Sequence, residues 1–269
     1  MAAIRSLQPA IGSLVRNPII VIVAAMYSLL QLPQLLVPTT QPLLSIVVSL
    51  VMTGVLILFL PFYQGGIIGM ADDARTGTTT LGMLIETGKS NYVSLLLAYF
   101  VILAIAIVLG IVVAIAAIGG GIGVIAGNGQ PSPAVLAVLA IVGLLIAVAY
   151  FAVVIAIQFY AHEIVLNNAG VAEGFTRSVG LVRENVLSVL GYSLLMFVGG
   201  GIIGALGAGA SFLVSPQPPL ESMLPELSLP VIVGAAIVSV LASALLGAFY
   251  ATYSVTFYRN ISGPSQAGL

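Results

Sequence analysis

The chain has 269 residues, of which 60% are hydrophobic and 6% are charged, and its formal net charge is -1. Soluble domains carry about 25% charged residues, so this composition excludes a soluble fold and indicates an integral membrane protein. The chain has no basic tract that could hold a nucleic-acid backbone by counterion release, so nucleic acid is excluded as a partner. It has no cysteine, which excludes disulfides and thiolate metal sites.

The first third of the chain predicts a short amphipathic helix followed by two membrane spans. Residues 4–15 place apolar side chains such as Ile11 on one side of a helix and Arg5 on the other. Apolar runs follow at about 18–37 and 43–63, and each is close to the roughly 20 residues that cross the hydrocarbon layer. Because the first run has no convincing small-residue cleavage site, we expect a retained span rather than a signal peptide.

The middle third predicts the same order of elements. Residues 81–92 carry apolar side chains on one helical face, opposite Glu86 and Lys89. Two apolar runs follow, at about 92–125 and 134–161, and both are long enough to span the bilayer with some tilt. Neither run alternates apolar and polar residues, so we expect helices rather than the strands of a barrel.

The last third begins with a charged segment between two apolar runs, GFTRSVGLVRENVLSVLGY at residues 174–192. As a helix, this segment has Phe175, Val179, Val182 and Val186 on one side and Arg177, Arg183 and Glu184 on the other. Glu173 stands four residues before Arg177, an order that favours a helical ion pair. We expect the last two spans at about 186–214 and 231–258.

All the basic residues fall on one side of this six-span scheme. Arg5 and Arg16 precede the first span, Arg75 and Lys89 lie between the second and third, Arg177 and Arg183 lie between the fourth and fifth, and Arg259 follows the sixth. The positive-inside rule makes that side cytoplasmic. We therefore expect a multi-pass protein of the cell membrane with both termini in the cytoplasm.

Each pair of spans resembles the next in its boundary residues. Asparagine follows closely after a basic residue at Asn17, Asn91 and Asn185, where odd spans begin, and a Phe-Tyr pair closes the even spans at Phe62-Tyr63, Phe159-Tyr160 and Phe249-Tyr250. This order predicts an all-α protein with one integral membrane domain over 1–269, built from three hairpins of the same orientation. The hairpins are expected at about 1–70, 71–170 and 171–260.

The segments between hairpins have two interpretations. We expect each to be a short amphipathic helix that lies along the cytoplasmic headgroups, with the Phe-Tyr pairs as aromatic anchors at the same interface. The alternative is a solvated loop whose arginine residues only set the topology. Apolar side chains at every third or fourth position favour the helix.

Residues from about 160 to 195 resemble a broad prokaryotic group of six-span proteins, which includes the membrane domain attached to some glycerophosphoryl diester phosphodiesterases. In that group a Gly-Phe-x-x-Ser segment, here Gly174, Phe175 and Ser178, precedes a basic-x-Asn start of a span, here Arg183 and Asn185. The resemblance implies an all-helical membrane module, often of unassigned activity. We expect no phosphodiesterase catalytic domain here, so no catalytic residue is carried over. Arginine also outnumbers lysine six to one, which is typical of GC-rich prokaryotic genomes such as those of haloarchaea.

The single histidine stands in FYAHEIVLNN, where His162 and Glu163 could begin an HExxH zinc motif. Leu166 occupies the position of the second histidine, so the motif is incomplete. A Ser211–His162 dyad is also excluded, because these residues lie at opposite ends of their spans, about 30 Å apart.

The remaining candidates for a divalent-ion site are the carboxylates of Asp72, Asp73, Glu163 and Glu173. We favour a polar cap at the membrane surface instead, and we expect no catalytic, cofactor-binding or metal-binding residue and no cofactor.

Composition and motifs leave two classes of function open. Glycine-rich segments at 119–127 and 199–211 contain small-xxx-small spacing, for example Gly119 with Gly123 and Gly200 with Gly204, which favours close helix packing within or between subunits. No ionisable residue lies well inside a span, which argues against an ion-coupled transporter. We therefore expect a non-enzymatic scaffold or membrane-organising protein, whose partners are membrane lipids, other membrane proteins or further copies of the chain. The alternative is a permease or lipid-handling protein for a neutral or amphiphilic molecule.

Overall fold

The structure is a computed structural model that describes residues 2–30, 42–126, 133–214 and 229–263. Within these ranges every regular element is an α-helix, as the sequence predicts. The helices are α1 Ala2–Arg5, α2 Leu7–Arg16, α3 Ile19–Leu30, α5 Pro42–Thr76, α6 Leu81–Ser90, α7 Tyr92–Ala126, α8 Pro133–Ile157, α9 Tyr160–Asn167, α10 Val171–Glu184, α11 Val186–Val214 and α12 Leu229–Ser262. Helices satisfy their own backbone groups, which a lipid environment requires.

Four to six helices of the described chain are long and apolar enough to cross a membrane. Four qualify alone, at Leu43–Thr76, Tyr92–Gly119, Pro133–Asn167 and Ile237–Ser262. Two more spans are counted if each of two bent helix pairs is one span: Ala2–Arg16 with Ile19–Leu30, bent by 88°, and Val171–Glu184 with Val186–Ile202, bent by 105°. The all-helical membrane class is confirmed at this level. Part of the expected first span, after Leu30, lies outside the described residues.

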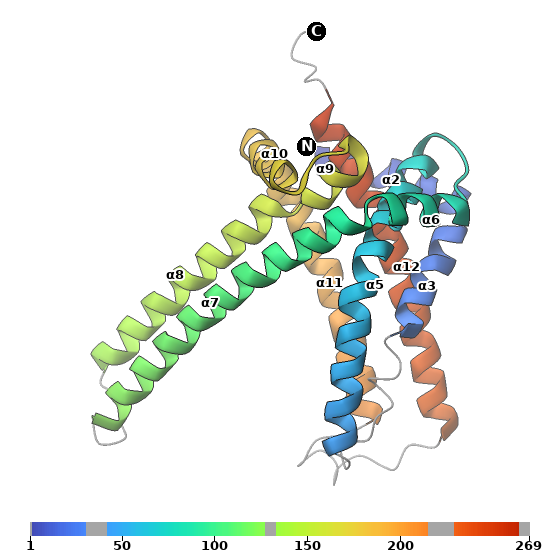
Figure 1. Cartoon of the computed structure of the whole chain (residues 1–269). Coiled ribbons are helices and arrows are strands. Elements are labelled where there is room, and N and C mark those ends of the chain that lie inside the picture. The colour runs from blue at the N-terminus through green and yellow to red at the C-terminus, as the bar shows by residue number, and fades with distance from the viewer. Residues whose placement is uncertain (1, 31–41, 127–132, 215–228, 264–269) are drawn as a thin grey trace.

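The short helices gather at one end of the molecule, and the long helices extend away from it (Figure 1). This end is formed by α1, α2, α6, α9, α10 and the last turns of α5 and α12, and we call it the cationic end. All seven basic residues belong to these elements. From there α7 and α8 run side by side and lean away from α3, α5, α11 and α12 (Figure 1).

Buried side chains concentrate at the cationic end. One cluster packs the Phe159 ring, which directly precedes α9, with aromatic rings of α11 and α12, and the Tyr192 and Phe257 centroids are 4.4 Å apart and nearly parallel. By contrast, none of the residues in the most apolar 18-residue stretches of Leu43–Thr76, Tyr92–Gly119 and Pro133–Asn167 is buried. The long helices are therefore held together at one end and leave their apolar sides open over most of their length.

The Phe159-Tyr160 pair does not anchor the chain at a lipid interface, so that expectation is wrong for the second hairpin. Phe159 is fully buried and Tyr160 is 8% exposed. A turn at residues 158–159 separates α8 from α9, and the Phe159 ring lies near Tyr192 (5.5 Å between centroids) and Phe257 (5.9 Å). The corresponding pairs at 62–63 and 249–250 are half-buried.

The three amphipathic segments are helical, and each ends at the same kind of turn. The side-chain amide of Asn17 donates to the Ser13 carbonyl (2.9 Å), that of Asn91 to Thr87 (3.0 Å) and that of Asn185 to Leu181 (3.0 Å). In every case the acceptor is the carbonyl four residues earlier, and the next long helix starts directly after the turn. Asparagine is suited to such helix ends because its side chain replaces lost backbone hydrogen bonds.

The three helices differ in what covers their apolar sides. On α2, Ile11 and Val15 are exposed, and α6 exposes Leu81 and Ile85. On α10, however, the Phe175 ring stacks on Tyr160 of α9 with 5.1 Å between centroids, and Val182 is buried. The expected lipid-facing side of α10 is thus covered by protein, which corrects the sequence interpretation for this helix.

Candidate functional site

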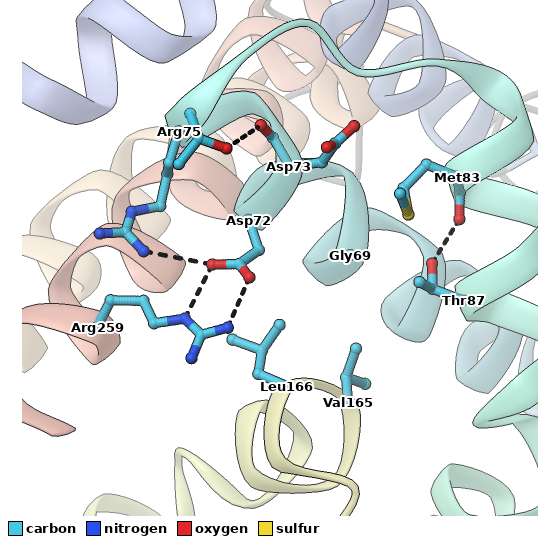
Figure 2. Close-up of a pocket in the computed structure, with 10 residues that line it drawn as sticks. Gly69, Asp72, Asp73, Arg75, Met83, Thr87, Val165, Leu166 and Arg259 are labelled. Atoms are coloured by element: carbon cyan, nitrogen blue, oxygen red, sulfur yellow. Dashed lines mark hydrogen bonds and ion pairs between the residues drawn. The ribbon is translucent and has the colours of Figure 1, made fainter. Parts of the chain in front are cut away.

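A polar pocket of about 620 Å³ lies at the cationic end, where α5, α6, α9 and α12 meet (Figure 2). It is lined by Gly69, Asp72, Asp73, Arg75, Thr76, Met83, Thr87, Val165, Leu166 and Arg259. Pockets of this size are typical of small-molecule sites. Its walls come from three of the expected hairpins, so no single stretch of sequence contains it.

A bidentate ion pair between α5 and α12 forms one side of the pocket. Arg259 donates from Nε to Oδ1 of Asp72 (2.9 Å) and from Nη2 to Oδ2 (2.6 Å), and Arg75 donates from Nη1 to Oδ1 (3.3 Å). The Asp72 and Arg259 side chains are 26% and 32% exposed. Parallel N–H···O bonds fix both the distance and the orientation of the two helices. The pair therefore locks the last turns of α5 and α12 together.

The other side of the pocket carries one unpaired carboxylate, one hydroxyl that is already hydrogen-bonded and two apolar side chains. Asp73 has no hydrogen-bond or ion-pair partner for its carboxylate within the described residues, and Figure 2 shows it pointing away from Asp72. The Thr87 hydroxyl donates to the Met83 carbonyl (2.6 Å), so it is already engaged. Val165 and Leu166 close the pocket from α9 (Figure 2). Two aspartates and two arginines thus give the lining a balanced charge.

Glycine residues hold α6 close against α5, and one of them, Gly69, lines the pocket. A Cβ atom added to Gly66 would lie 2.6 Å from the Leu84 carbonyl oxygen, and one added to Gly88 would lie 2.8 Å from the Phe62 carbonyl oxygen. A Cβ on Gly69 would overlap the Thr87 side chain. Only glycine permits such close approach of two backbones. The sequence interpretation missed these residues, although the QGGIIG spacing was a visible signal for Gly66 and Gly69.

The glycine residues that the sequence singled out have a different environment. A Cβ on Gly119, Gly200 or Gly204 would have no neighbouring atom within 4 Å in the described chain. Gly199 is an exception, because a Cβ there would overlap the Tyr250 hydroxyl. Among the glycines of these two segments that the structure describes, only Gly199 is therefore packed closely within the subunit, against Tyr250.

A second polar cluster lies close to the pocket and surrounds the histidine. His162 Nε2 is 3.3 Å from the Ser254 hydroxyl, and its ring stacks on Tyr258 with 5.2 Å between centroids. His162 and Ser254 are both buried. Ser254 was not identified from the sequence, because 92 residues separate it from His162. The contact joins α9 to α12.

The four candidate carboxylates are divided between two places. Asp72 and Asp73 line the pocket, whereas Glu163 and Glu173 both face Arg177. The expected Glu173–Arg177 pair is confirmed, with 2.5 Å between Oε1 and Nη2. Glu163 is buried, accepts a hydrogen bond from Asn167 (2.8 Å) and lies 4.0 Å from Arg177. Among the described residues no three His, Cys, Asp or Glu side chains come together as metal ligands would. Ser211 lies in α11, and its side chain is outside the described residues.

The cationic end and the long apolar helices together define a polytopic α-helical membrane protein. The chain belongs to the family described as Domain of unknown function (DUF7847), whose model matches residues 1–261. No curated protein and no solved structure matches the chain.

Proposed function

We propose that the protein is a non-enzymatic scaffold or membrane-organising protein, anchored by six spans as three hairpins of one orientation, with the cationic end in the cytoplasm. The observation that carries this proposal is the uneven packing: the helices are joined at the cationic end, and three of the apolar stretches bury no residue. Helix faces in lipid associate by close packing rather than by hydrophobic force. The open faces of the long helices are therefore available to other membrane helices. A prokaryotic origin and the likeness to the phosphodiesterase membrane domain are part of the same proposal.

A second copy of the chain is the first partner that we propose, and α11 supplies the contact. Gly200 and Gly204 are exposed, one helical turn apart, and have no neighbouring atom at the position of a Cβ. Phe197 and Ile202 beside them are 71% and 51% exposed. Glycine in a helix interior is less favourable than alanine by about 1 kcal/mol in water, whereas it lets two helices in lipid approach closely. These features support association between copies through α11.

Substituting Gly200 and Gly204 together by valine is expected to convert the protein from dimers or larger assemblies to monomers, because two branched side chains would separate the paired helices. Native mass spectrometry from a mild detergent measures the assembly directly. Gly180→Val is the matched control, since Gly180 also has no neighbour within 4 Å but lies on α10 at the cationic end. A wild-type protein that is monomeric under all conditions contradicts self-association.

An apolar cavity favours the alternative function. A space of about 570 Å³ lies between α7 and α8, lined by small and aromatic residues that include Gly110, Gly143, Tyr150 and Phe151. An acyl chain is the kind of molecule that such an apolar cavity accepts. If the same mass spectra contain a monomer with one tightly bound lipid, and Gly110→Leu with Gly143→Leu removes that lipid, the lipid-handling function replaces the scaffold.

The proposed topology is tested by cysteine labelling, because the chain has no native cysteine. Ala134→Cys at the start of α8 is expected to react with a membrane-impermeant maleimide in intact cells. Ala172→Cys on α10 and Ser262→Cys at the end of α12 are expected to react only after permeabilisation, since both belong to the cationic end. All three positions are exposed. Equal labelling of Ala134→Cys and Ala172→Cys in intact cells would overturn the six-span scheme.

A further inference from the structure

The polar pocket is lined by N–H donors and by a carboxylate that remain free to bind an anion and a cation. Each guanidinium group has five N–H donors, and the contacts with Asp72 engage two nitrogen atoms of Arg259 and one of Arg75. The Asp73 carboxylate is on the opposite side and has no partner within the described residues (Figure 2). A bound anion can thus be held by the arginines while a cation is held by Asp73.

The chain that follows the pocket-lining end of α5 is hydrogen-bonded to the end of α2, a helix that has the features of an interfacial helix. Asn17, at the end of α2, accepts a hydrogen bond from the Thr79 backbone (2.8 Å) and donates to the Gly77 carbonyl (3.2 Å), directly after the pocket-lining end of α5. Next to this corner α2 exposes Val15 together with Arg16. Apolar and basic side chains exposed on one short helix are typical of the headgroup region. These exposed side chains support a position of the pocket near the lipid headgroups.

We propose that this pocket binds a phosphorylated primary amine, with its phosphate on the free edges of Arg75 and Arg259 and its ammonium group on Asp73. Arginine is well suited to phosphate because its planar N–H groups match the phosphate oxygens. A simple anion would be repelled by Asp72 and Asp73, and a simple cation by the two arginines, whereas a molecule with both charges can place each of them beside a group of opposite charge. The apolar side chains of Val165 and Leu166 face the carbon linker.

Two molecules carry this chemistry, and the experiment distinguishes them. One is the headgroup of phosphatidylethanolamine in the membrane, and the other is free phosphoethanolamine. Native mass spectrometry of the full chain is carried out with added phosphatidylethanolamine, phosphatidylcholine or phosphatidylglycerol. We expect one phosphatidylethanolamine to be retained per chain, because phosphatidylcholine has no N–H donor for Asp73 and phosphatidylglycerol has no ammonium group. Displacement of that lipid by millimolar free phosphoethanolamine would identify the soluble molecule as a ligand, and no displacement would identify the lipid.

Variants test the named contacts. Asp73→Asn and Arg75→Gln are each expected to weaken binding of phosphatidylethanolamine by about tenfold or more, the usual effect of losing a hydrogen bond to a charged group. Arg183→Gln on α10, which does not line the pocket, is the matched control and should bind as the wild type does. If a variant is unstable in a melting test, the lipid preference of the wild-type protein decides. Equal retention of phosphatidylglycerol and phosphatidylethanolamine, or unchanged binding in both stable variants, overturns the proposal. This binding does not depend on self-association, so either can fail alone.

Discussion

Replacement of Asn17 by alanine is expected to lower the free energy of unfolding by about 2–5 kcal/mol, because it leaves buried backbone groups without partners. Asn17 is 2% exposed and joins the corner between α2 and α3 to the segment after α5. Its amide nitrogen contacts the carbonyl oxygens of Ser13, Ala74 and Gly77, and its oxygen accepts from the Thr79 N–H group. Thr79 is itself 6% exposed, so water cannot readily replace the lost bond.

Asn185→Ala is the matched control for this prediction. Asn185 ends α10 with the same local bond, from its amide to the Leu181 carbonyl (3.0 Å), and no contact to another segment is described for it. Its loss should cost about 1 kcal/mol, the value of one ordinary hydrogen bond. Unfolding by increasing SDS in mixed micelles compares the two variants under identical conditions. Equal destabilisation would show that the long-range bonds of Asn17 contribute nothing.

The positions of the long helices could be predicted from the sequence because the bilayer imposes a simple physical condition. A run of apolar residues in lipid must satisfy its backbone groups internally, so it becomes a helix of about the same extent. The run at 92–125 corresponds to α7 at Tyr92–Ala126, and the run at 186–214 corresponds to α11 at Val186–Val214. Here local composition alone determines the element.

The pocket could not be predicted, because it depends on tertiary packing. The apolar run that ends near Tyr63 continues as helix to Thr76, and only this extension brings Asp72 beside Arg259. These two residues are 187 positions apart, and neither stands in a motif. Asp72 and Asp73 were considered as metal ligands from the sequence, whereas the partner of Asp72 is an arginine.

The asparagine residues show the same division between local and tertiary information. Their spacing from the basic residues identified three similar helix ends, and the local bonds of Asn17, Asn91 and Asn185 are alike. Only Asn17 is described with bonds to a distant segment, because residues 74–79 pass beside it. Which of three similar turns is most important for stability is therefore set by the neighbouring chain, and the sequence pattern treats them equally.

Gly66→Ala is expected to destabilise the protein by about 1–3 kcal/mol or more, the range for overpacking of a close contact. The new Cβ would lie 2.6 Å from the Leu84 carbonyl oxygen and 2.5 Å from Leu84 Cδ1. A side-chain atom can rotate away, but the carbonyl belongs to the backbone of α6, so the whole helix must move outward from α5. That displacement would widen the polar pocket, since α6 supplies Met83 and Thr87 to its lining.

Two further variants separate the backbone collision from other effects of alanine. Gly54→Ala lies on the same helix, where a Cβ has no neighbour within 4 Å, so it is expected to be neutral or to stabilise α5 by up to about 1 kcal/mol through helix propensity. Adding Leu84→Ala to Gly66→Ala removes the contact with Cδ1 and leaves the one with the carbonyl oxygen, so recovery should be partial. Full recovery in the same SDS titration would mean that the Leu84 side chain, and not close backbone approach, requires glycine at position 66.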